Sequence, residues 1–222
     1  MRPLVIVGAA NDGELIADLV QDINEVEPTF EIVGFLDDDP AKQSTCVNGY
    51  PVLGPLGAHH RVPSAAAFVL AVASAKRTFR TRRVAEALKV TPDRLATLVH
   101  PLATVSRSAT LGHGCVVMAG TRVNARVRLG DHVLVEGNAW LGVGTTVGDY
   151  AVVTHDASVS GDCVLGQGCY VGANASIRGR TRIGAWAVVG MGAAVVRDVP
   201  TGAVVVGNPA RQVATVDAGE DG

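Results

Sequence analysis

Bulky aliphatic residues recur at every sixth position through the second half of the chain. The series runs through seventeen repeats without an insertion and contains only Val, Leu and Ile. A small or β-branched residue follows four positions after each member, from Ala103 to Val199. A period of six fits neither an amphipathic helix nor an alternating strand, and it is typical of a β-solenoid with short flat sides. The members are Val99, Val105, Leu111, Val117, Val123, Leu129, Val135, Leu141, Val147, Val153, Val159, Leu165, Val171, Ile177, Ile183, Val189 and Val195.

Three such sides make a coil of eighteen residues, so the repeats predict between five and six coils. We expect the aliphatic residue to fill the interior and the small residue to occupy each crowded corner. A Gly often follows the aliphatic residue, and we expect it to adopt the unusual dihedrals of the turn. The period ends at Thr201, just beyond Pro200.

The first half of the chain alternates between strand-like and helix-like segments. Apolar runs at 4–7, 30–36 and 67–72 predict strands, and residues 14–20 and 76–88 have helical spacing. Strands separated by helices predict a parallel sheet with both faces covered.

The change of pattern near residue 98 predicts two domains. We expect an α/β domain over residues 1–97, a β-solenoid domain over residues 98–208 and a flexible polar tail over residues 209–222.

Composition excludes several classes of partner. With 19 basic and 21 acidic residues the net charge is −2, which gives no reason to expect nucleic acid or an acidic membrane surface. No apolar run approaches the ~18 residues of a membrane span, and the N-terminus lacks the pattern of a signal peptide. The four cysteines form no CxxC motif, so we expect reduced thiols in a cytoplasmic protein.

Several motifs resemble one family of acyltransferases. They are VIVGAANDGELIADLV, VGFLDDDP, NGYPVLG, LVHPLATVSRSATLGHGCVVMAGTRVNARVRLG and VVGMGAAVVRDVPTGAVVVGNPAR. Over about residues 3–212 the chain resembles the nucleotide-amino-sugar N-acetyltransferases and sialic acid O-acetyltransferases. The resemblance implies a Rossmann-like nucleotide- or sugar-binding domain followed by a left-handed parallel β-helix. It further implies a homotrimer that binds acetyl-CoA between neighbouring β-helices and needs no metal.

The resemblance also implies binding residues at matching positions. Gly161, Ala173 and Met191 correspond to positions that contact acetyl-CoA. The positions implied to bind the sugar nucleotide are Gly13, Asp37, Asp38 and Gly54.

The chain departs from the family at the catalytic base. The family's His and acidic pair falls at Val143 and Gly144, neither of which can accept a proton on its side chain, and Glu136 replaces a frequent Asn. A His-Asp pair, His155 and Asp156, stands twelve residues later, which is two hexads. We expect His155, with Asp156 beside it, to act as the base from a different corner of the coil.

Other interpretations of the histidines stay open. His155 lies at an exterior hexad position where any polar residue is accepted, so it can also be an ordinary surface or interface residue or a contact to a bound group. His132 with Glu136 is a weaker candidate pair.

The resemblance implies acetyl-CoA-dependent acyl transfer to an amino group of a sugar or nucleotide-linked amino sugar. The alternative is a catalytically silent β-helix trimer that acts as a binding or assembly protein. A zinc enzyme of the γ-carbonic anhydrase type is disfavoured, because it needs three histidines that meet at a subunit interface. The candidates His113, His132 and His155 do not share one corner.

Overall fold

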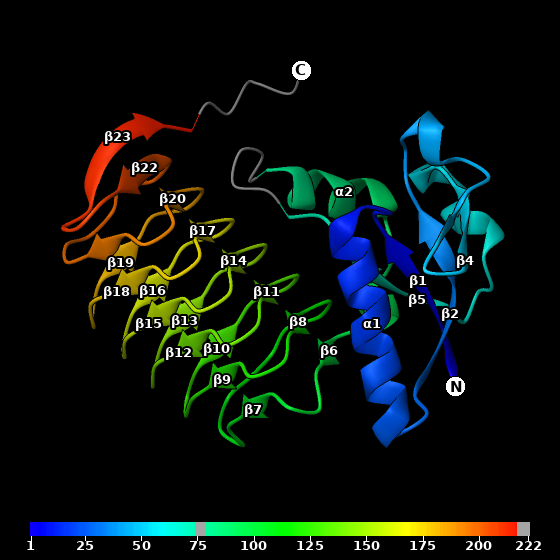
Figure 1. The fold of residues 1–222 in the computed structure, drawn as a ribbon, viewed down its shortest axis with the longest axis horizontal. Coiled ribbons are helices and arrows are strands. Elements are labelled where there is room, and N and C mark those ends of the chain that lie inside the picture. The colour runs from blue at the N-terminus through cyan, green and yellow to red at the C-terminus, as the bar shows by residue number, and fades with distance from the viewer. Residues whose placement is uncertain (74–78, 217–222) are drawn as a thin grey trace.

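The computed structural model describes residues 1–73 and 79–216 and divides into two parts, which Figure 1 shows side by side. The N-terminal part holds a five-stranded sheet in the order β3-β4-β2-β1-β5. All its neighbouring strands are parallel except β3, which is antiparallel to β4. The elements are β1 (Arg2–Val7), α1 (Asn11–Val26), β2 (Phe30–Leu36), η1 (Pro40–Lys42), β3 (Cys46–Val47), β4 (Tyr50–Gly54), η2 (Leu56–Arg61), β5 (Ala67–Leu70), α2 (Arg80–Leu88) and η3 (Pro92–Arg94).

Successive side chains of β1 point to opposite faces of the sheet, and both faces are covered. Leu4 and Ile6 pack into one core with α1, whereas Val5 and Val7 pack into a second core that includes Leu88 of α2. All four β1 residues are buried, as a strand between two helical layers requires.

The three predicted strands and both helices of this domain are confirmed, with small changes at their ends. The predicted start of the second helix, at residues 76–78, lies outside the described residues. Sequence reasoning missed β3 and β4. Pro and Gly are depleted in strands, so YPVLG does not resemble one in sequence, although β4 pairs with β2 on one side and with β3 on the other.

The C-terminal part is a β-helix. From β6 to β21 its strands have two residues each, and each pairs in parallel with the strand eighteen residues away. Its coils rise from β7 to β22 in Figure 1. We call the three sheets the first, second and third sides. The first side comprises β6 (Leu98–Val99), β8 (Val116–Val117), β11 (Leu134–Val135), β14 (Val152–Val153), β17 (Tyr170–Val171), β20 (Val188–Val189) and β22 (Ala203–Val206). The second side comprises β7 (Thr104–Val105), β9 (Arg122–Val123), β12 (Trp140–Leu141), β15 (Ser158–Val159), β18 (Ser176–Ile177) and β21 (Ala194–Val195). The third side comprises β10 (Arg128–Leu129), β13 (Thr146–Val147), β16 (Val164–Leu165) and β19 (Arg182–Ile183).

The hexad prediction is confirmed in detail. From Val117 to Val195 every aliphatic residue of the series is buried, as are the small residues four positions later, and both kinds belong to one core. The three corners of the coil therefore differ mainly in their outward-facing side chains. We call the turn from the first to the second side the first corner, that from the second to the third side the second corner, and that from the third to the first side the third corner.

The role expected of the glycines that follow aliphatic residues is wrong. Gly148, for example, has no positive φ, but a Cβ there would lie 2.6 Å from the backbone N of Gln167 in the next coil. Gly is needed for this close approach between coils. The left-handed residue stands two positions later in the turn, and it is often not glycine, as with Tyr150 at φ 62° and Asp156 at φ 57°.

The end of the chain also differs from expectation. Residues predicted to belong to a flexible tail form β23 (Arg211–Thr215), which pairs antiparallel with β22. Its hydrogen bonds cover the open edge of the first side, which would otherwise expose unpaired backbone groups.

The two domains are joined by packing and by polar contacts. Leu98 and Val116 of the first side share a core with α1, which Figure 1 shows between the sheet and the β-helix. His100 receives the N–H of Leu102 on Nδ1, so Nε2 donates to Asp22 Oδ2 of α1 at 2.9 Å. None of the helices within the described ranges has the length and hydrophobicity to cross a membrane.

Candidate active site

His155 stands on the first corner, directly after β14, with its ring on the outside of the coil. Its Nδ1 lies 3.3 Å from Oε2 of Glu136, and its backbone N–H donates to the same oxygen at 3.1 Å. With Nδ1–H donating to Glu136, Nε2 is the nitrogen that can accept a proton. The side chain of His155 is 59% exposed and that of Glu136 is 29% exposed, so the pair is open to a ligand.

Glu136, rather than the neighbouring Asp156, is the carboxylate that orients the imidazole. Asp156 takes the left-handed turn position, and its backbone N–H donates to the carbonyl of Gly137 in the preceding coil. The side-chain hydrogen bond of His155 goes to Glu136 and not to its neighbour in sequence.

Two cavities meet at His155 and Glu136. The first, of about 270 Å³, lies between the N-terminal domain and the first side of the β-helix, and we call it the interdomain cavity. The second, of about 550 Å³, follows the first corner toward the C-terminal end, and we call it the corner groove. Because the two residues line both spaces, a group bound in one can meet a group bound in the other at this pair.

The corner groove contains two of the three positions expected to bind acetyl-CoA. Ala173 and Met191 stack above His155, one and two coils further along, and both line the groove. Met191 is 82% exposed, although it is a large apolar residue. Tyr170 lines the same groove, and burial and the nearby carboxylates of Glu136 and Asp12 raise the pKa of its phenol, which therefore stays protonated at neutral pH.

The third position, Gly161, lies elsewhere, at the second corner. A Cβ on Gly161 would sit 3.0 Å from the carbonyl oxygen of Val143 in the preceding coil. Val143 is 40% exposed and lines a separate hollow of about 270 Å³ together with Arg122 and Asn124. Within one chain, therefore, the groove residues and the Val143 corner are on opposite edges of the second side.

The two other candidate histidines, His113 and His132, lie at the third corner. His113 Nδ1 is 3.3 Å from Asp131 Oδ1, a pair that resembles His155 and Glu136, but His113 lines neither the interdomain cavity nor the corner groove. His132 is buried and stacks on Tyr150 with ring centroids 5.3 Å apart, and burial lowers its pKa. The alternative pair of His132 with Glu136 does not form, since Glu136 contacts His155. Among the described residues, no three His, Cys, Asp or Glu side chains gather in a group that could hold a metal.

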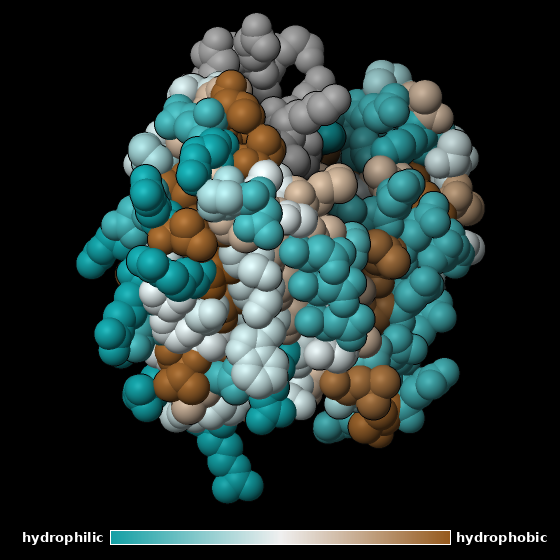
Figure 2. All heavy atoms as spheres, turned by 60° about the vertical axis from the view of Figure 1, so that its left-hand side comes forward, coloured by the Kyte–Doolittle hydropathy of each residue, from teal (hydrophilic) through white to brown (hydrophobic). Residues whose placement is uncertain are grey.

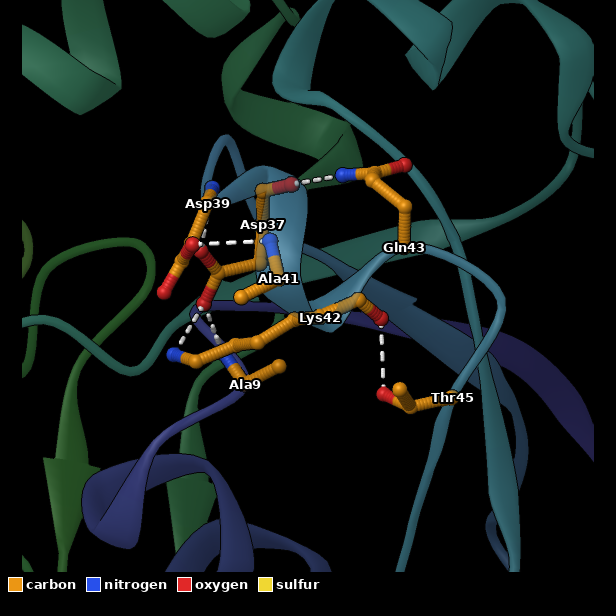
Figure 3. A network of polar contacts seen from close by, with 7 residues as sticks. All are labelled: Ala9, Asp37, Asp39, Ala41, Lys42, Gln43 and Thr45. Carbon is orange, nitrogen blue, oxygen red and sulfur yellow. Dashed lines mark hydrogen bonds and ion pairs between the residues drawn. The ribbon is translucent and has the colours of Figure 1, made fainter.

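Asp37 of the N-terminal domain is bonded within its own loop (Figure 3). Its Oδ2 accepts from the backbone N–H of Ala9 and from Lys42 Nζ, both at 2.8 Å, and its Oδ1 accepts from the N–H of Asp39 at 3.0 Å. Burial disfavours the charged form, but these hydrogen bonds outweigh it and lower the pKa of Asp37 below its ordinary value. Asp38 Oδ1 accepts from the N–H of Leu56 at 2.7 Å.

The two glycines expected at the nucleotide site have packing roles in the structure. A Cβ on Gly13 would lie 2.3 Å from the carbonyl oxygen of Gly8, so Gly13 lets α1 approach the end of β1. Gly54 ends β4, and its carbonyl oxygen accepts from the backbone N–H of Asp37.

Comparisons with known proteins agree with this architecture. The PglD N-terminal domain model matches residues 3–83, and the bacterial transferase hexapeptide (six repeats) model matches residues 162–197. The acetyltransferase domain of PglB from Neisseria gonorrhoeae, solved in complex with acetyl coenzyme A, is 32% identical with a TM-score of 0.85, covering 96% of this chain and 99% of that one.

The chain belongs to the nucleotide-amino-sugar N-acetyltransferase family. A second relative is PerB from Caulobacter crescentus, solved with CoA and GDP-perosamine. It is 25% identical with a TM-score of 0.82, and the match covers 96% of this chain and 97% of that one. Comparison with curated protein sequences gave no match.

In the structure His155 has an acidic partner, Glu136, that the sequence analysis did not pair with it. The coil length of eighteen residues would have indicated this pairing. Residues eighteen apart stack, so position 137 lies beneath His155 and Glu136 is adjacent to that position. Tyr170, which lies eighteen residues after Val152 on the outer face of the first side, could have been found in the same way.

Proposed function

We propose that this chain is an acyl-CoA-dependent N-acyltransferase that acts on the amino group of an amino sugar, with His155 as general base. The observation that carries the proposal is that His155 and Glu136 line both the corner groove and the interdomain cavity. The solved relatives bind acetyl coenzyme A, or CoA with a nucleotide amino sugar, on the same fold.

In the proposed reaction the thioester lies in the corner groove against Ala173 and Met191. The acceptor amine lies in the interdomain cavity and attacks the thioester carbonyl carbon. Nε2 of His155 takes the proton that the amine loses, while the hydrogen bond to Glu136 stabilises the imidazolium that forms. Collapse of the tetrahedral intermediate breaks the C–S bond and forms the amide, and the CoA thiolate leaves and takes up a proton.

We further propose that three copies assemble so that the Val143 corner of one protomer covers the corner groove of its partner. In support, Val143 and Gly161 lie across the second side from His155, so one chain supplies only half of a closed groove. The outward residues of the second side include Ser158, Ser176 and Ala194, which allow close approach of another copy. Figure 2 turns this part of the molecule forward, and a band of pale residues runs down its middle between hydrophilic ones.

Acetyl-CoA as the proposed donor and the free cysteines, of which Cys115, Cys163 and Cys169 are buried, are consistent with a cytoplasmic site of action.

The His155→Ala variant tests the proposed base, and His113→Ala is its matched control. Both histidines hold the same hexad position and contact a carboxylate at 3.3 Å, but only His155 lines the two cavities. We expect His155→Ala to lower kcat for acetyl transfer from acetyl-CoA by about 100-fold or more, with unchanged CoA affinity. Unchanged turnover in His155→Ala refutes the role of the base. CoA binding without transfer to any amino sugar by the wild-type protein indicates a silent binding protein instead.

A further inference from the structure

Tyr170 presents its side chain to the corner groove. It is the first residue of β17, and it faces outward because the next residue, Val171, is buried inside the coil. The strand register places it directly opposite Val152 of the preceding coil, which is the coil that carries His155. Tyr170 is partly buried, and it lines the groove together with Glu136 and His155.

The phenol of Tyr170 is available to a ligand. Four of the described residues that line the groove have polar side chains, and three of these already bond within the protein. His155 and Glu136 contact each other, and Thr154 Oγ1 donates to the carbonyl oxygen of Val171 at 2.8 Å. Among the described residues, no group forms a hydrogen bond with the phenol of Tyr170. Its O–H can therefore donate to a molecule bound in the groove.

The same phenol lies close to the junction of the two cavities. Burial and then the carboxylates of Glu136 and Asp12 raise its pKa, so it is within electrostatic reach of both side chains. Glu136 lines both spaces, and Asp12 lines the interdomain cavity. The phenol thus stands near the place where the acceptor amine is proposed to meet the thioester.

From this arrangement we infer that Tyr170 is a further catalytic residue, whose phenol O–H donates a hydrogen bond to the carbonyl oxygen of the thioester. When the amine attacks the carbonyl carbon, the π electron pair moves to that oxygen, and the hydrogen bond strengthens as negative charge develops. Collapse of the intermediate returns the electron pair and expels the CoA thiolate, while Tyr170 keeps its proton. This inference rests on the proposed function and adds a group that stabilises the oxyanion.

Proton transfer from Tyr170 to the leaving thiolate is unfavourable. An ordinary Tyr has a pKa of about 10 and a thiol one of about 8.5, and the pKa of Tyr170 is raised further. The phenol therefore holds its proton more tightly than the thiol does, which leaves hydrogen-bond donation as its role. The carboxylate of Glu136 alone would repel an oxyanion, but the imidazolium that forms on His155 compensates its charge.

Infrared spectroscopy tests the hydrogen bond without any acceptor. The probe is acetyl-CoA with an isotope label at the carbonyl carbon, bound to an excess of the full-length protein. We expect the carbonyl stretch at a lower frequency in the wild-type protein than in Tyr170→Phe, because a hydrogen bond weakens the C=O bond. Phe retains the ring, so the midpoint of thermal unfolding should change little. The same frequency in both proteins overturns the inference.

Tyr150→Phe is the matched control for the spectrum and for turnover. Burial also raises the pKa of Tyr150, but this residue lies at the third corner and lines neither the interdomain cavity nor the corner groove. We expect Tyr170→Phe to lower kcat for acetyl transfer by about 100-fold, as loss of one oxyanion donor does, and Tyr150→Phe to leave kcat and the carbonyl frequency unchanged. Loss of kcat without a change in frequency contradicts the inference, and so does a change in frequency with wild-type kcat.

The two measurements separate the inference from the proposed function. A carbonyl frequency that rises in Tyr170→Phe, in a protein that transfers acetyl to no amino sugar, contradicts the proposed function and leaves the hydrogen bond standing. Acetyl transfer with equal frequencies in the two proteins supports the proposed function and overturns the inference. A wild-type protein that does not bind acetyl-CoA contradicts both.

Discussion

The ring of Phe79 stacks on the ring of Trp186, with centroids 4.3 Å apart and planes inclined by 24°. Phe79 immediately precedes α2 of the N-terminal domain, and Trp186 occupies the left-handed turn position of the third corner, at φ 60°. The stack therefore fixes α2 against the β-helix, on the side of the interdomain cavity where Thr81 lies.

We expect Trp186→Ala to destabilise the protein by about 2 kcal/mol, because it removes the stack and its buried apolar area. Trp140→Ala is the control, since Trp140 is 46% exposed on the second side and its ring makes a cation–π contact with Arg122 rather than an aromatic stack. Urea unfolding of both variants measures the difference. Equal loss of stability in the two variants would show that the stack does not couple the domains.

Asp37 should make stability depend on pH. Its pKa in the folded protein is lowered, so its contribution is fully present above the ordinary aspartate pKa of about 3.9 and is lost as pH falls through the lower folded value. We expect Asp37→Asn to cost about 1–3 kcal/mol at pH 7 and much less below pH 3. Urea unfolding at both pH values checks this, with Asp38→Asn as the comparison, because its amide oxygen can still accept the single bond from the Leu56 N–H. A pH-independent cost would contradict the ionic origin.

The β-helix could be predicted from the sequence because the six residues of each hexad are enough to determine one side of the coil. One aliphatic residue and one small residue per side determine which side chains point inward, and no long-range contact is needed to place the strands. The flat inner sides repeat every six residues, so an error in one hexad would not have shifted the others.

The site could be predicted only in part, because its polar contacts depend on loops and on stacking between coils. His155 was found from its hexad position, but its partner Glu136 comes from the preceding coil. Asp37 matched a binding motif, yet its bonds to Lys42 and Ala9 depend on the path of the loop after β2. The presence of an Asp at a motif position does not reveal whether its carboxylate is free to bind a ligand.

The glycines that directly follow aliphatic residues of the hexad series should be intolerant of any side chain. In Gly148→Ala the new Cβ would lie 2.6 Å from the backbone N of Gln167, and backbone cannot move aside within stacked coils. We expect a loss of more than about 2 kcal/mol in the free energy of unfolding. Gly57→Ala is the control, because a Cβ at Gly57 meets nothing within 4 Å. A Gly148→Ala variant as stable as the control would mean that the coils separate more easily than their hydrogen bonds indicate.

Widening the side chain at Ala173 should obstruct the corner groove. Ala173 lies between His155 and Met191 along that groove, so in Ala173→Leu the added atoms occupy the space proposed for the pantetheine arm. We expect the Kd for CoA to rise at least tenfold, and the midpoint of thermal unfolding to change little because the residue is only partly buried. Ala185→Leu, at the same hexad position on the third corner, is the matched control and should leave CoA affinity unchanged. Calorimetric titration with CoA measures both, and wild-type affinity in Ala173→Leu would remove the corner groove as the donor site.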